Sequence, residues 1–403
     1  MPEIVATLPR QDEAYVGQLL YSLSFCHPAV RDFRLEDGRL SVRYDDAAAR
    51  EEVEPRVRRL LDRFAGLSDE FVPKEVFRVA GRPDAAPGAD PYDALVERGW
   101  VVPVFQGQVV LRGPALDLVE FFDAESLRLV AEPMGARPEY YPSGISCEAL
   151  GKTAHFSSFP EHIQFVSHLT PDVEVIDGFT TRYREAESIP HAASAEGQVF
   201  ELPAVVMNPS VCYHCYNALA GETVEKPGRA VTARSRCQRY EAGNHATLRR
   251  LMDFTMREVI FVGEPNFVLE TRAETLQRLQ AMFERWEIAC RLESSNDPFF
   301  TDDYATKAAF QRHQDLKYEL RADLPFPDGG SIAVASSNYH SVTFGRAFGI
   351  KTGTRPACTG CLGFGLERLM YTVFSQFGLD PSGWPEGLRA DFAAWQAREG
   401  RNP

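Results

Sequence analysis

Two runs of alternating side chains, joined by a short glycine-containing segment, form the clearest pattern along the chain. The first run is short and places Arg239 and Glu241 two residues apart. The second run, Asp253–Val262, carries Phe254 and Glu258 within one alternating set. Because successive side chains of a strand point to opposite faces, each set lies on one face. We therefore predict a long antiparallel hairpin whose one face is suited to holding a nucleotide and a metal ion.

Residues 1–80 have the pattern of a separate small unit. The order of its predicted elements indicates an α+β domain: a strand at Glu3–Leu8, a helix at Asp12–Cys26, two short strands about an Asp-Gly turn, and a helix at Asp46–Phe64. Pro55 predicts a kink or a break in the last helix. Since no chemical motif occurs here, we interpret the unit as a packing or dimerisation module, with a remnant substrate-binding domain as the alternative.

The segment 81–91 has the glycine and proline content of a linker, and residues 92–403 then form a larger domain. Its early elements are predicted as a helix at Tyr92–Arg98, strands within Val101–Arg112 and a helix at Leu116–Leu129. Apolar residues at three- and four-residue spacing predict a further helix at Thr271–Leu292.

The chain of 403 residues carries 57 acidic and 43 basic side chains, a formal net charge of −14. This balance argues against a large nucleic-acid footprint, because such a surface must neutralise phosphates. Eight cysteines in a chain of this length do not indicate a disulfide framework. No apolar run reaches membrane-spanning length, and the first residues lack the pattern of a signal peptide. We expect a soluble protein of the reducing cytoplasm with no membrane partner.

The predicted hairpin resembles motif 2 of class II aminoacyl-tRNA synthetases, in which an Arg-x-Glu strand, a loop and a returning phenylalanine bind ATP. The segment Cys361–Arg368, a glycine-bearing strand leading into a helix, resembles motif 3. The finer resemblance is to the amino acid:[carrier protein] ligases, which are seryl-tRNA-synthetase-like enzymes without tRNA-binding appendages. It covers about residues 90–400 and is carried, in order, by Asn208–Tyr216, Phe254–Glu258, Asn296–Phe300, Leu316–Glu319, Asn338–His340 and Leu379–Trp384. Those ligases are shorter, so residues 1–80 depart from the family pattern.

This resemblance implies an α+β fold of the class II synthetase type, with an antiparallel sheet flanked by helices, in a homodimer. It implies that Arg239 clamps the α-phosphate and the amino-acid carboxylate, and that Arg368 binds phosphate near a helix N-terminus. Phe254 would stack under the adenine, and Glu241 would contact its amino group. Without the resemblance, the strand pattern favours Arg239 as a surface arginine paired with Glu241. The corresponding alternatives are ordinary sheet core for Phe254 and a helix-surface arginine for Arg368.

The cysteines allow two interpretations of a metal site. Two Cys-x-x-Cys pairs, Cys212/Cys215 and Cys358/Cys361, are compatible with a four-cysteine structural zinc, although the gap between them is far longer than in a zinc ribbon. The resemblance instead implies a zinc held by Cys212, Glu258 and Cys361, with an open position for the substrate amino group. A chain without metal is the third possibility.

The remaining site residues also follow from the resemblance. Asp297 and Asn338 are predicted to line the amino-acid pocket, and Lys317 lies with Glu319 on a strand that enters the site. Glu319 is a candidate Mg²⁺ ligand, with a surface or neighbouring structural carboxylate as the alternative.

The implied activity is ATP-dependent formation of an aminoacyl-adenylate, followed by transfer to the phosphopantetheine thiol of a carrier protein. Its cofactors would be Zn²⁺ and Mg²⁺, with ATP as a substrate. Aminoacylation of tRNA is the second possibility, although the acidic balance and the absence of a long heptad helix in residues 1–80 make it unfavoured. A non-catalytic module that binds ATP or an amino acid is the third. The sequence leaves the amino acid open, and the predicted helix Thr271–Leu292, which carries several arginines, is a candidate carrier docking surface.

Overall fold

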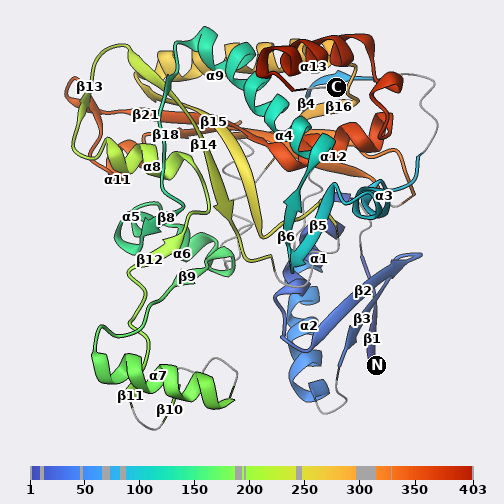
Figure 1. Ribbon diagram of the computed structural model, residues 1–403, viewed down its shortest axis with the longest axis vertical. Helices are drawn as coiled ribbons and strands as arrows, with labels where there is room; N and C mark the ends of the chain where they lie inside the picture. The colour runs from blue at the N-terminus through green and yellow to red at the C-terminus, as the bar shows by residue number, and fades with distance from the viewer. Residues whose placement is uncertain are drawn as a thin grey trace.

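The computed structural model describes residues 2–9, 13–45, 49–65, 73–81, 88–186, 193–194, 197–241, 247–295, 315–327 and 329–401. Within this part of the chain, eight strands form the large sheet at the centre of the molecule (Figure 1). In spatial order they are β4 (Glu75–Val79), β16 (Cys290–Ser294), β17 (Lys317–Asp323), β18 (Ser331–Ser341), β21 (Cys358–Gly365), β15 (Asp253–Gly263), β14 (Gly228–Gln238) and β7 (Arg137–Pro138). Neighbours are antiparallel except for β7, which runs parallel to β14. The predicted antiparallel sheet is confirmed.

Strands β14 and β15 form the predicted hairpin and pair along the whole length of β14. β14 is longer than the alternating run suggests and ends at Gln238, so Arg239 and Glu241 lie just beyond the strand. The backbone N–H of Arg239 still donates to the carbonyl of Met252 at 2.9 Å, which extends the pairing by one residue. Arg239 therefore keeps the face that alternation predicts.

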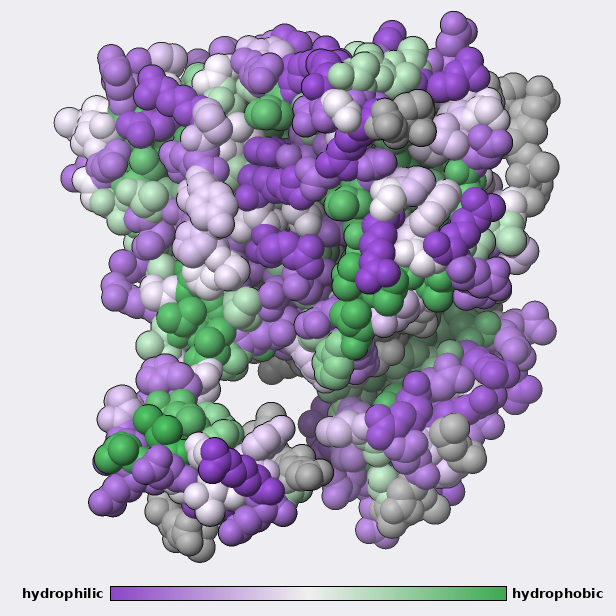
Figure 2. All heavy atoms as spheres, in the orientation of Figure 1, coloured by the Kyte–Doolittle hydropathy of each residue, from purple (hydrophilic) through white to green (hydrophobic). Residues whose placement is uncertain are grey.

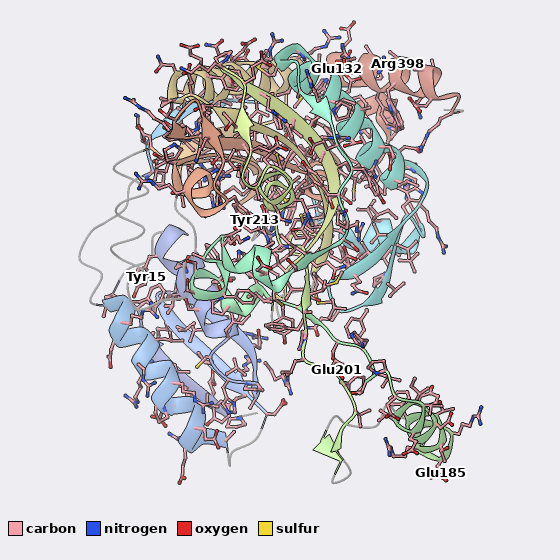
Figure 3. All side chains as sticks on the ribbon, turned by 90° about the vertical axis from the view of Figure 1, so that its left-hand side faces the viewer. Tyr15, Glu132, Glu185, Glu201, Tyr213 and Arg398 are labelled. Carbon is pink, nitrogen blue, oxygen red and sulfur yellow. The ribbon has the colours of Figure 1, made fainter. Side chains whose placement is uncertain are left out.

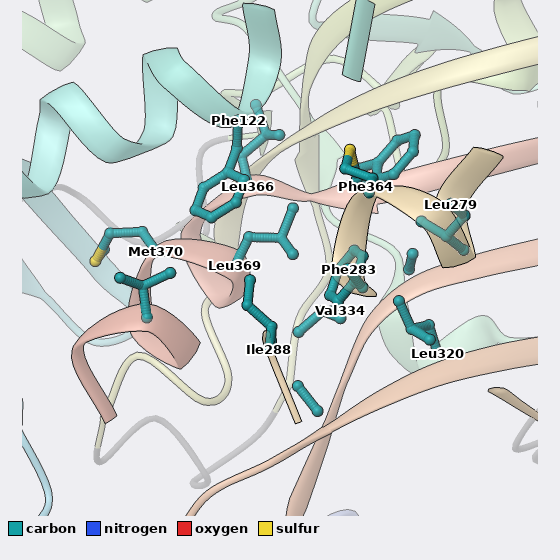
Figure 4. Packing of buried hydrophobic residues seen from close by; sticks show 14 of the residues in the cluster. Phe122, Leu279, Phe283, Ile288, Leu320, Val334, Phe364, Leu366, Leu369 and Met370 are labelled. Carbon is teal, nitrogen blue, oxygen red and sulfur yellow. The ribbon is translucent and has the colours of Figure 1, made fainter. Parts of the chain in front are cut away.

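Helices cover one face of the sheet, where α9 and α12 pack on the strands and α4 packs on α12 (Figure 1). The four helices of this layer are α4 (Gly113–Ser126), α9 (Pro265–Arg285), α12 (Leu366–Phe377) and α13 (Glu386–Glu399). Their apolar faces meet the strands in one core, in which Phe122, Phe283 and Leu369 lie near Phe364 of β21 (Figure 4). The predicted helix Thr271–Leu292 is wrong at both ends, since α9 begins at Pro265 and ends at Arg285. It ends early because Glu287 adopts a left-handed φ of 52° and the residues from Cys290 onward form β16.

A buried ion pair joins α4 to β15. Arg257 donates to Asp123 from Nε to Oδ1 at 2.7 Å and from Nη2 to Oδ2 at 2.9 Å, and both residues are 8% exposed. Because removal of one partner leaves the other charge buried, Asp123→Ala is expected to lower the free energy of unfolding by about 3–5 kcal/mol. Urea denaturation measures this loss. The matched control is Asp117→Ala on the same helix, which breaks a more exposed pair with Arg401 and should cost at most about 1 kcal/mol; equal losses would contradict the assignment.

The N-terminal unit is the predicted small α+β fold, with its own core of buried apolar residues. Its elements are β1 (Glu3–Thr7), α1 (Glu13–Ser24), β2 (Val30–Glu36), β3 (Arg39–Tyr44) and α2 (Arg50–Ala65), and the strands form an antiparallel sheet in the order β1-β3-β2. Asp37 and Gly38 both take left-handed φ values, 49° and 74°, as a tight turn between β2 and β3 requires. The predicted break at Pro55 is wrong, since α2 is one continuous helix.

Strand β4 lies within the range 1–80 but pairs with β16 of the large sheet. Since this strand belongs to the larger domain, we propose a boundary before Glu75 in place of the predicted one at residue 80. Residues 82–87 of the predicted linker 81–91 lie outside the described residues.

The other face of the sheet is partly covered by short elements. They include two small sheets, one of β8 (Gly144–Ser146), β12 (Val205–Met207) and β9 (Phe165–Val166) and one of β13 (Thr223–Val224), β19 (Lys351–Thr352) and β20 (Arg355–Pro356). The short helices on this side are α5 (Cys147–Gly151), α6 (His155–Ser158), η4 (Pro160–His162), α8 (Cys212–Ala218) and α11 (Thr343–Ala347). After β4, the larger domain continues with α3 (Tyr92–Glu97) and the hairpin β5 (Val101–Phe105) and β6 (Gln108–Leu111), close to prediction. The chain is completed by η2 (Leu127–Ala131), η3 (Glu132–Met134), η5 (Pro381–Gly383) and the short pair β10 (Ala193–Ser194) and β11 (Gly197–Gln198).

An arm bearing α7 (Val173–Ala186) projects from this side, between β9 and β12, as the labels at Glu185 and Glu201 mark in Figure 3. The helix has no buried residue, and Val173 is 70% exposed. Figure 2 shows apolar side chains on the arm and on the neighbouring small sheet. Among the described residues, no helix combines the length and apolar character needed to span a membrane.

Candidate active site

The sheet face opposite α9 and α12 gathers the predicted site residues from neighbouring strands. Two rows of paired residues cross it, one of Lys317, Asn338 and Cys361, and the next of Glu319, Ser336, Gly363 and Glu258. The rows are two residues apart along each strand, so both point to the same face. A Cβ on Gly363 would lie 2.9 Å from Met256 Cε and 3.3 Å from Glu258 Cγ, so the glycine leaves the Glu258 side chain its place.

Cys212, Glu258 and Cys361 form a compact cluster at the centre of this face. Cys212 is the first residue of α8, which lies over the sheet, while the other two come from β15 and β21. Their ligand atoms all lie within 4.8 Å of one another, and the three residues are buried. The structure thus brings together the three residues that the resemblance assigns to zinc.

The donors of this cluster fit a zinc ion. Glu258 Oε1 accepts a hydrogen bond from the backbone of Val211 at 3.2 Å, whereas Oε2 is buried without a hydrogen-bond partner among the described residues. Two thiols and one carboxylate are donors that zinc prefers, and three protein ligands leave a position open. Burial raises the pKa of Glu258, and the neighbouring Cys212 together with burial raises the pKa of Cys361. A divalent cation would stabilise the deprotonated forms of all three.

The other two cysteines of the Cys-x-x-Cys pairs, Cys215 and Cys358, do not belong to this cluster. Cys358 lies three residues before Cys361 on β21, and this odd spacing turns its side chain to the helix-covered face, where it belongs to the large core. Cys215 packs in the core beneath α8, and burial raises the pKa of its thiol. The geometry therefore favours the open three-ligand site over the four-cysteine site.

Arg239 lies over the ring of Phe254 and within electrostatic reach of Glu258. Its Nε donates to the carbonyl of Pro209 at 2.9 Å, and its guanidinium carbon lies 5.4 Å from the centroid of the Phe254 ring. The Asn208-Pro209 motif thus helps to fix the position of the guanidinium. The alternative in which Arg239 pairs with Glu241 does not match the structure, since Glu241 pairs with Arg250 at 2.9 Å.

Arg368, in the first turn of α12, is held by two backbone carbonyls. Its Nε donates to Arg249 at 3.1 Å and its Nη1 to Ala333 at 3.0 Å. Burial, aided by the nearby positive charges of Arg250 and Arg239, lowers the pKa of Arg368 to about 10. The positive charges of these three arginines repel one another and attract an anion. Such a cluster is suited to binding phosphates.

The pocket residues are placed unequally. Lys317 is buried and its Nζ lies 2.9 Å from Glu319 Oε1, while Asn338 Nδ2 lies 3.7 Å from Cys361 Sγ. Asn338 thus lies beside Cys361 of the candidate metal site, and Glu319 faces the same side of the sheet one row away. Asp297 lies outside the described residues.

Sequence reasoning missed Arg250, which holds Glu241 and contributes to the charge around Arg368. The available signal was the pair Arg249-Arg250 just before the second strand of the hairpin. It also missed Ser210 and Val211, whose hydroxyl and backbone N–H reach Glu258 at 3.5 and 3.2 Å. These groups lie in the motif segment but have no side-chain pattern of their own.

The arginines of the candidate docking helix are engaged within the chain. Arg272 is buried and donates to Ser337, and Arg291 lies on β16. The other two are paired with carboxylates, Arg278 with Glu274 and Arg285 with Asp391. These contacts do not support that helix as a basic docking surface.

No family model matches the chain. Among curated proteins, it is 30% identical over 311 residues to "Amino acid--[acyl-carrier-protein] ligase 1" of Bradyrhizobium diazoefficiens, a match that covers 76% of this chain and 91% of that protein. It is 27% identical to a "Type-2 serine--tRNA ligase" of Methanococcus aeolicus, covering 74% of this chain and 58% of that protein. A protein of the same name from Methanothermobacter thermautotrophicus is 25% identical, with 89% of this chain and 72% of that protein covered.

Solved structures agree on the fold. The chain superposes on M. kandleri SerRS, crystallised in complex with A. aeolicus tRNASec, with a TM-score of 0.72 at 24% identity, covering 100% of this chain and 78% of that one. The cytoplasmic serine-tRNA ligase of Naegleria fowleri, solved with AMP, gives a TM-score of 0.60 at 16% identity, covering 86% of this chain and 79% of that one. With the sequence match to the Bradyrhizobium protein, these findings show that the chain belongs to the amino acid:[carrier protein] ligase family, built on the class II aminoacyl-tRNA synthetase fold.

Proposed function

We propose that this protein activates an amino acid with ATP as an aminoacyl-adenylate and transfers the aminoacyl group to the phosphopantetheine thiol of a carrier protein. The observation that carries the proposal is the juxtaposition, on one sheet face, of the Cys212, Glu258 and Cys361 cluster with Arg239 and Arg368. The cluster is suited to the amino end of an amino acid, and the arginines are suited to the phosphates of ATP.

In the first step, a carboxylate oxygen of the amino acid forms a bond to the α-phosphorus of ATP. The bond from that phosphorus to the oxygen that bridges to the β-phosphate breaks, and pyrophosphate leaves. Arg239 stabilises the charge that builds on the α-phosphate oxygens, and Arg368 holds phosphate from the first turn of α12. Phe254 offers its ring to the adenine, and Glu241 accepts from the adenine amino group.

The amino acid is held from its other end. A zinc ion on Cys212, Glu258 and Cys361, when bound, supplies a Lewis acid for the free α-amino group. Asn338 lies beside that point and, with Lys317 and Asp297, is proposed to line the pocket. Glu319 is proposed to bind Mg²⁺ near the departing phosphates, because its carboxylate lies on the site face of the sheet, in the same row as Glu258.

In the second step, the thiol sulfur of the carrier attacks the carbonyl carbon of the adenylate, a thioester forms and AMP leaves. Two observations support a carrier over tRNA: the relative that is 30% identical is named as a carrier-protein ligase, and the net charge of −14 disfavours a polyanionic partner. We also propose a homodimer, as the family resemblance implies.

Aminoacylation of tRNA is the second candidate. One observation favours it: the match to the SerRS structure solved with a tRNA covers the whole chain, including the N-terminal unit that shorter carrier-protein ligases lack.

The adenylation step is tested by ATP–pyrophosphate exchange, screened over the common amino acids and several unusual ones. We expect exchange that depends on one or a few of these amino acids. A purified, zinc-containing protein that exchanges with none of them is a non-catalytic module.

The acceptor is tested by competition. The enzyme with ATP and its labelled amino acid is offered a phosphopantetheinylated carrier protein and total tRNA together, and the label is expected on the carrier, where hydroxylamine releases it from a thioester. Label on tRNA alone would reverse the acceptor assignment and leave the adenylation step standing.

A further inference from the structure

The N-terminal unit touches the nucleotide end of the site through α1. Tyr21 on this helix is 6% exposed, although it lies outside the apolar core of its own unit. Its hydroxyl donates to Glu161 Oε1 at 2.9 Å and lies 2.6 Å from His162 Nε2, and both partners belong to η4 of the larger domain. Just after the end of α1, the ring of Phe25 lies 6.3 Å from that of Tyr240.

The ring of Tyr21 is connected through Arg250 to Glu241, the residue proposed to contact the adenine amino group. The guanidinium carbon of Arg250 lies 5.3 Å from the centroid of the Tyr21 ring, and Arg250 Nη1 lies 2.9 Å from Glu241 Oε2. The segment η4 also meets this part of the site, because the backbone of Tyr240 donates to the carbonyl of His162 at 2.9 Å. Helix α1 is thus connected to Glu241 in two indirect ways: through Arg250, and through His162 and the backbone of Tyr240.

The contact is polar at its centre. An interface that serves packing alone needs apolar side chains, whereas here a tyrosine hydroxyl, a carboxyl and an imidazole are hydrogen-bonded out of water. Burial raises the pKa of Glu161 to about 7, which marks how far this group is removed from solvent. Such a network fixes one orientation of the Tyr21 ring, and a fixed ring restricts the guanidinium that lies over it.

We propose that Tyr21 is a positioning residue of the ATP site, whose ring holds Arg250 so that Arg250 keeps the Glu241 carboxylate in place for the adenine amino group. The inference rests on the proposed function, in which Glu241 contacts ATP. It gives the N-terminal unit a part in nucleotide binding, in addition to packing or dimerisation.

Tyr21→Leu removes both the ring and the hydroxyl, and Tyr15→Leu is the matched control. Tyr15 lies on the same helix with the same 6% exposure, but it packs on Phe64 within its own unit, where Figure 3 labels it. In exchange assays, Tyr21→Leu is expected to raise KM for ATP about tenfold and to leave KM for the amino acid within about twofold. Tyr21→Phe keeps the ring under Arg250 and should raise KM for ATP by about threefold or less.

Binding of a non-hydrolysable ATP analogue, measured by titration calorimetry, separates the possible failures. If the wild-type protein catalyses pyrophosphate exchange and the Tyr21→Leu variant binds the analogue as tightly as the wild-type protein, the positioning role is wrong and the proposed function stands. The same follows if Tyr15→Leu raises KM for ATP as much as Tyr21→Leu, or if Tyr21→Leu weakens both substrates equally. A wild-type protein that neither exchanges nor binds the analogue overturns the proposed function and this inference together.

Discussion

Replacing Cys212 or Cys361 with alanine is expected to remove bound zinc and to lower the rate of amino-acid-dependent pyrophosphate exchange by more than about 100-fold. The ligand atoms of these residues and Glu258 lie within 4.8 Å of one another in a buried cluster, so the loss of one leaves too few donors to retain the metal. Loss of groups that merely support a metal ligand already costs about 10–100-fold, and the loss of a ligand itself should cost more. Zinc content by mass spectrometry and exchange kinetics measure the two effects.

The chain supplies its own control, since it has two more buried cysteines close by in sequence. Cys215→Ala and Cys358→Ala make the same chemical change, yet Cys358 faces the helix-covered core and Cys215 packs beneath α8. Both variants are expected to keep zinc and exchange. If all four cysteines prove equally necessary for metal retention, a four-cysteine structural site is correct.

The sequence predicts the fold well where the alternation of side chains along a strand is long and uninterrupted. The second run, Asp253–Val262, predicts β15 to within one residue, because one face of the strand meets the helix layer and the other the site. Helix ends were less accessible. The apolar spacing that predicts Thr271–Leu292 continues past Arg285, and only the left-handed backbone at Glu287 and the pairing of β16 with β17 end the helix. Tertiary pairing overrides local pattern here.

In the site, too, local sequence patterns predict some features and not the contacts between distant segments. The odd spacing of Cys358 and Cys361, once both are placed on a strand, already predicts opposite faces. In contrast, no local pattern connects Tyr21 with Arg250 or Glu258 with the backbone of Val211, because these contacts depend on how separate segments pack. Resemblance supplied what alternation cannot, namely which residues of a shared face bind phosphate and which bind metal.

Arg239→Ala is expected to lower kcat/KM for pyrophosphate exchange by about 10³-fold, because the guanidinium would stabilise charge that builds on the α-phosphate only during the reaction. Arg239→Lys should recover little of this loss, since an ammonium cannot fork onto two oxygens. Zinc content and thermal stability should stay near those of the wild-type protein, because Arg239 is partly exposed and its described contacts are one backbone carbonyl and the Phe254 ring.

The matched control for this last experiment is Arg236→Ala, three residues earlier on the same hairpin. The odd spacing places Arg236 on the opposite face, where it pairs with Asp253 at 2.8 Å, so its loss should change exchange by less than about threefold. An Arg239→Ala enzyme that exchanges as well as the Arg236→Ala enzyme would show that Arg239 is an ordinary surface arginine. The adenylation chemistry would then depend on Arg368 and Arg250, the other arginines that the structure brings to this end of the site.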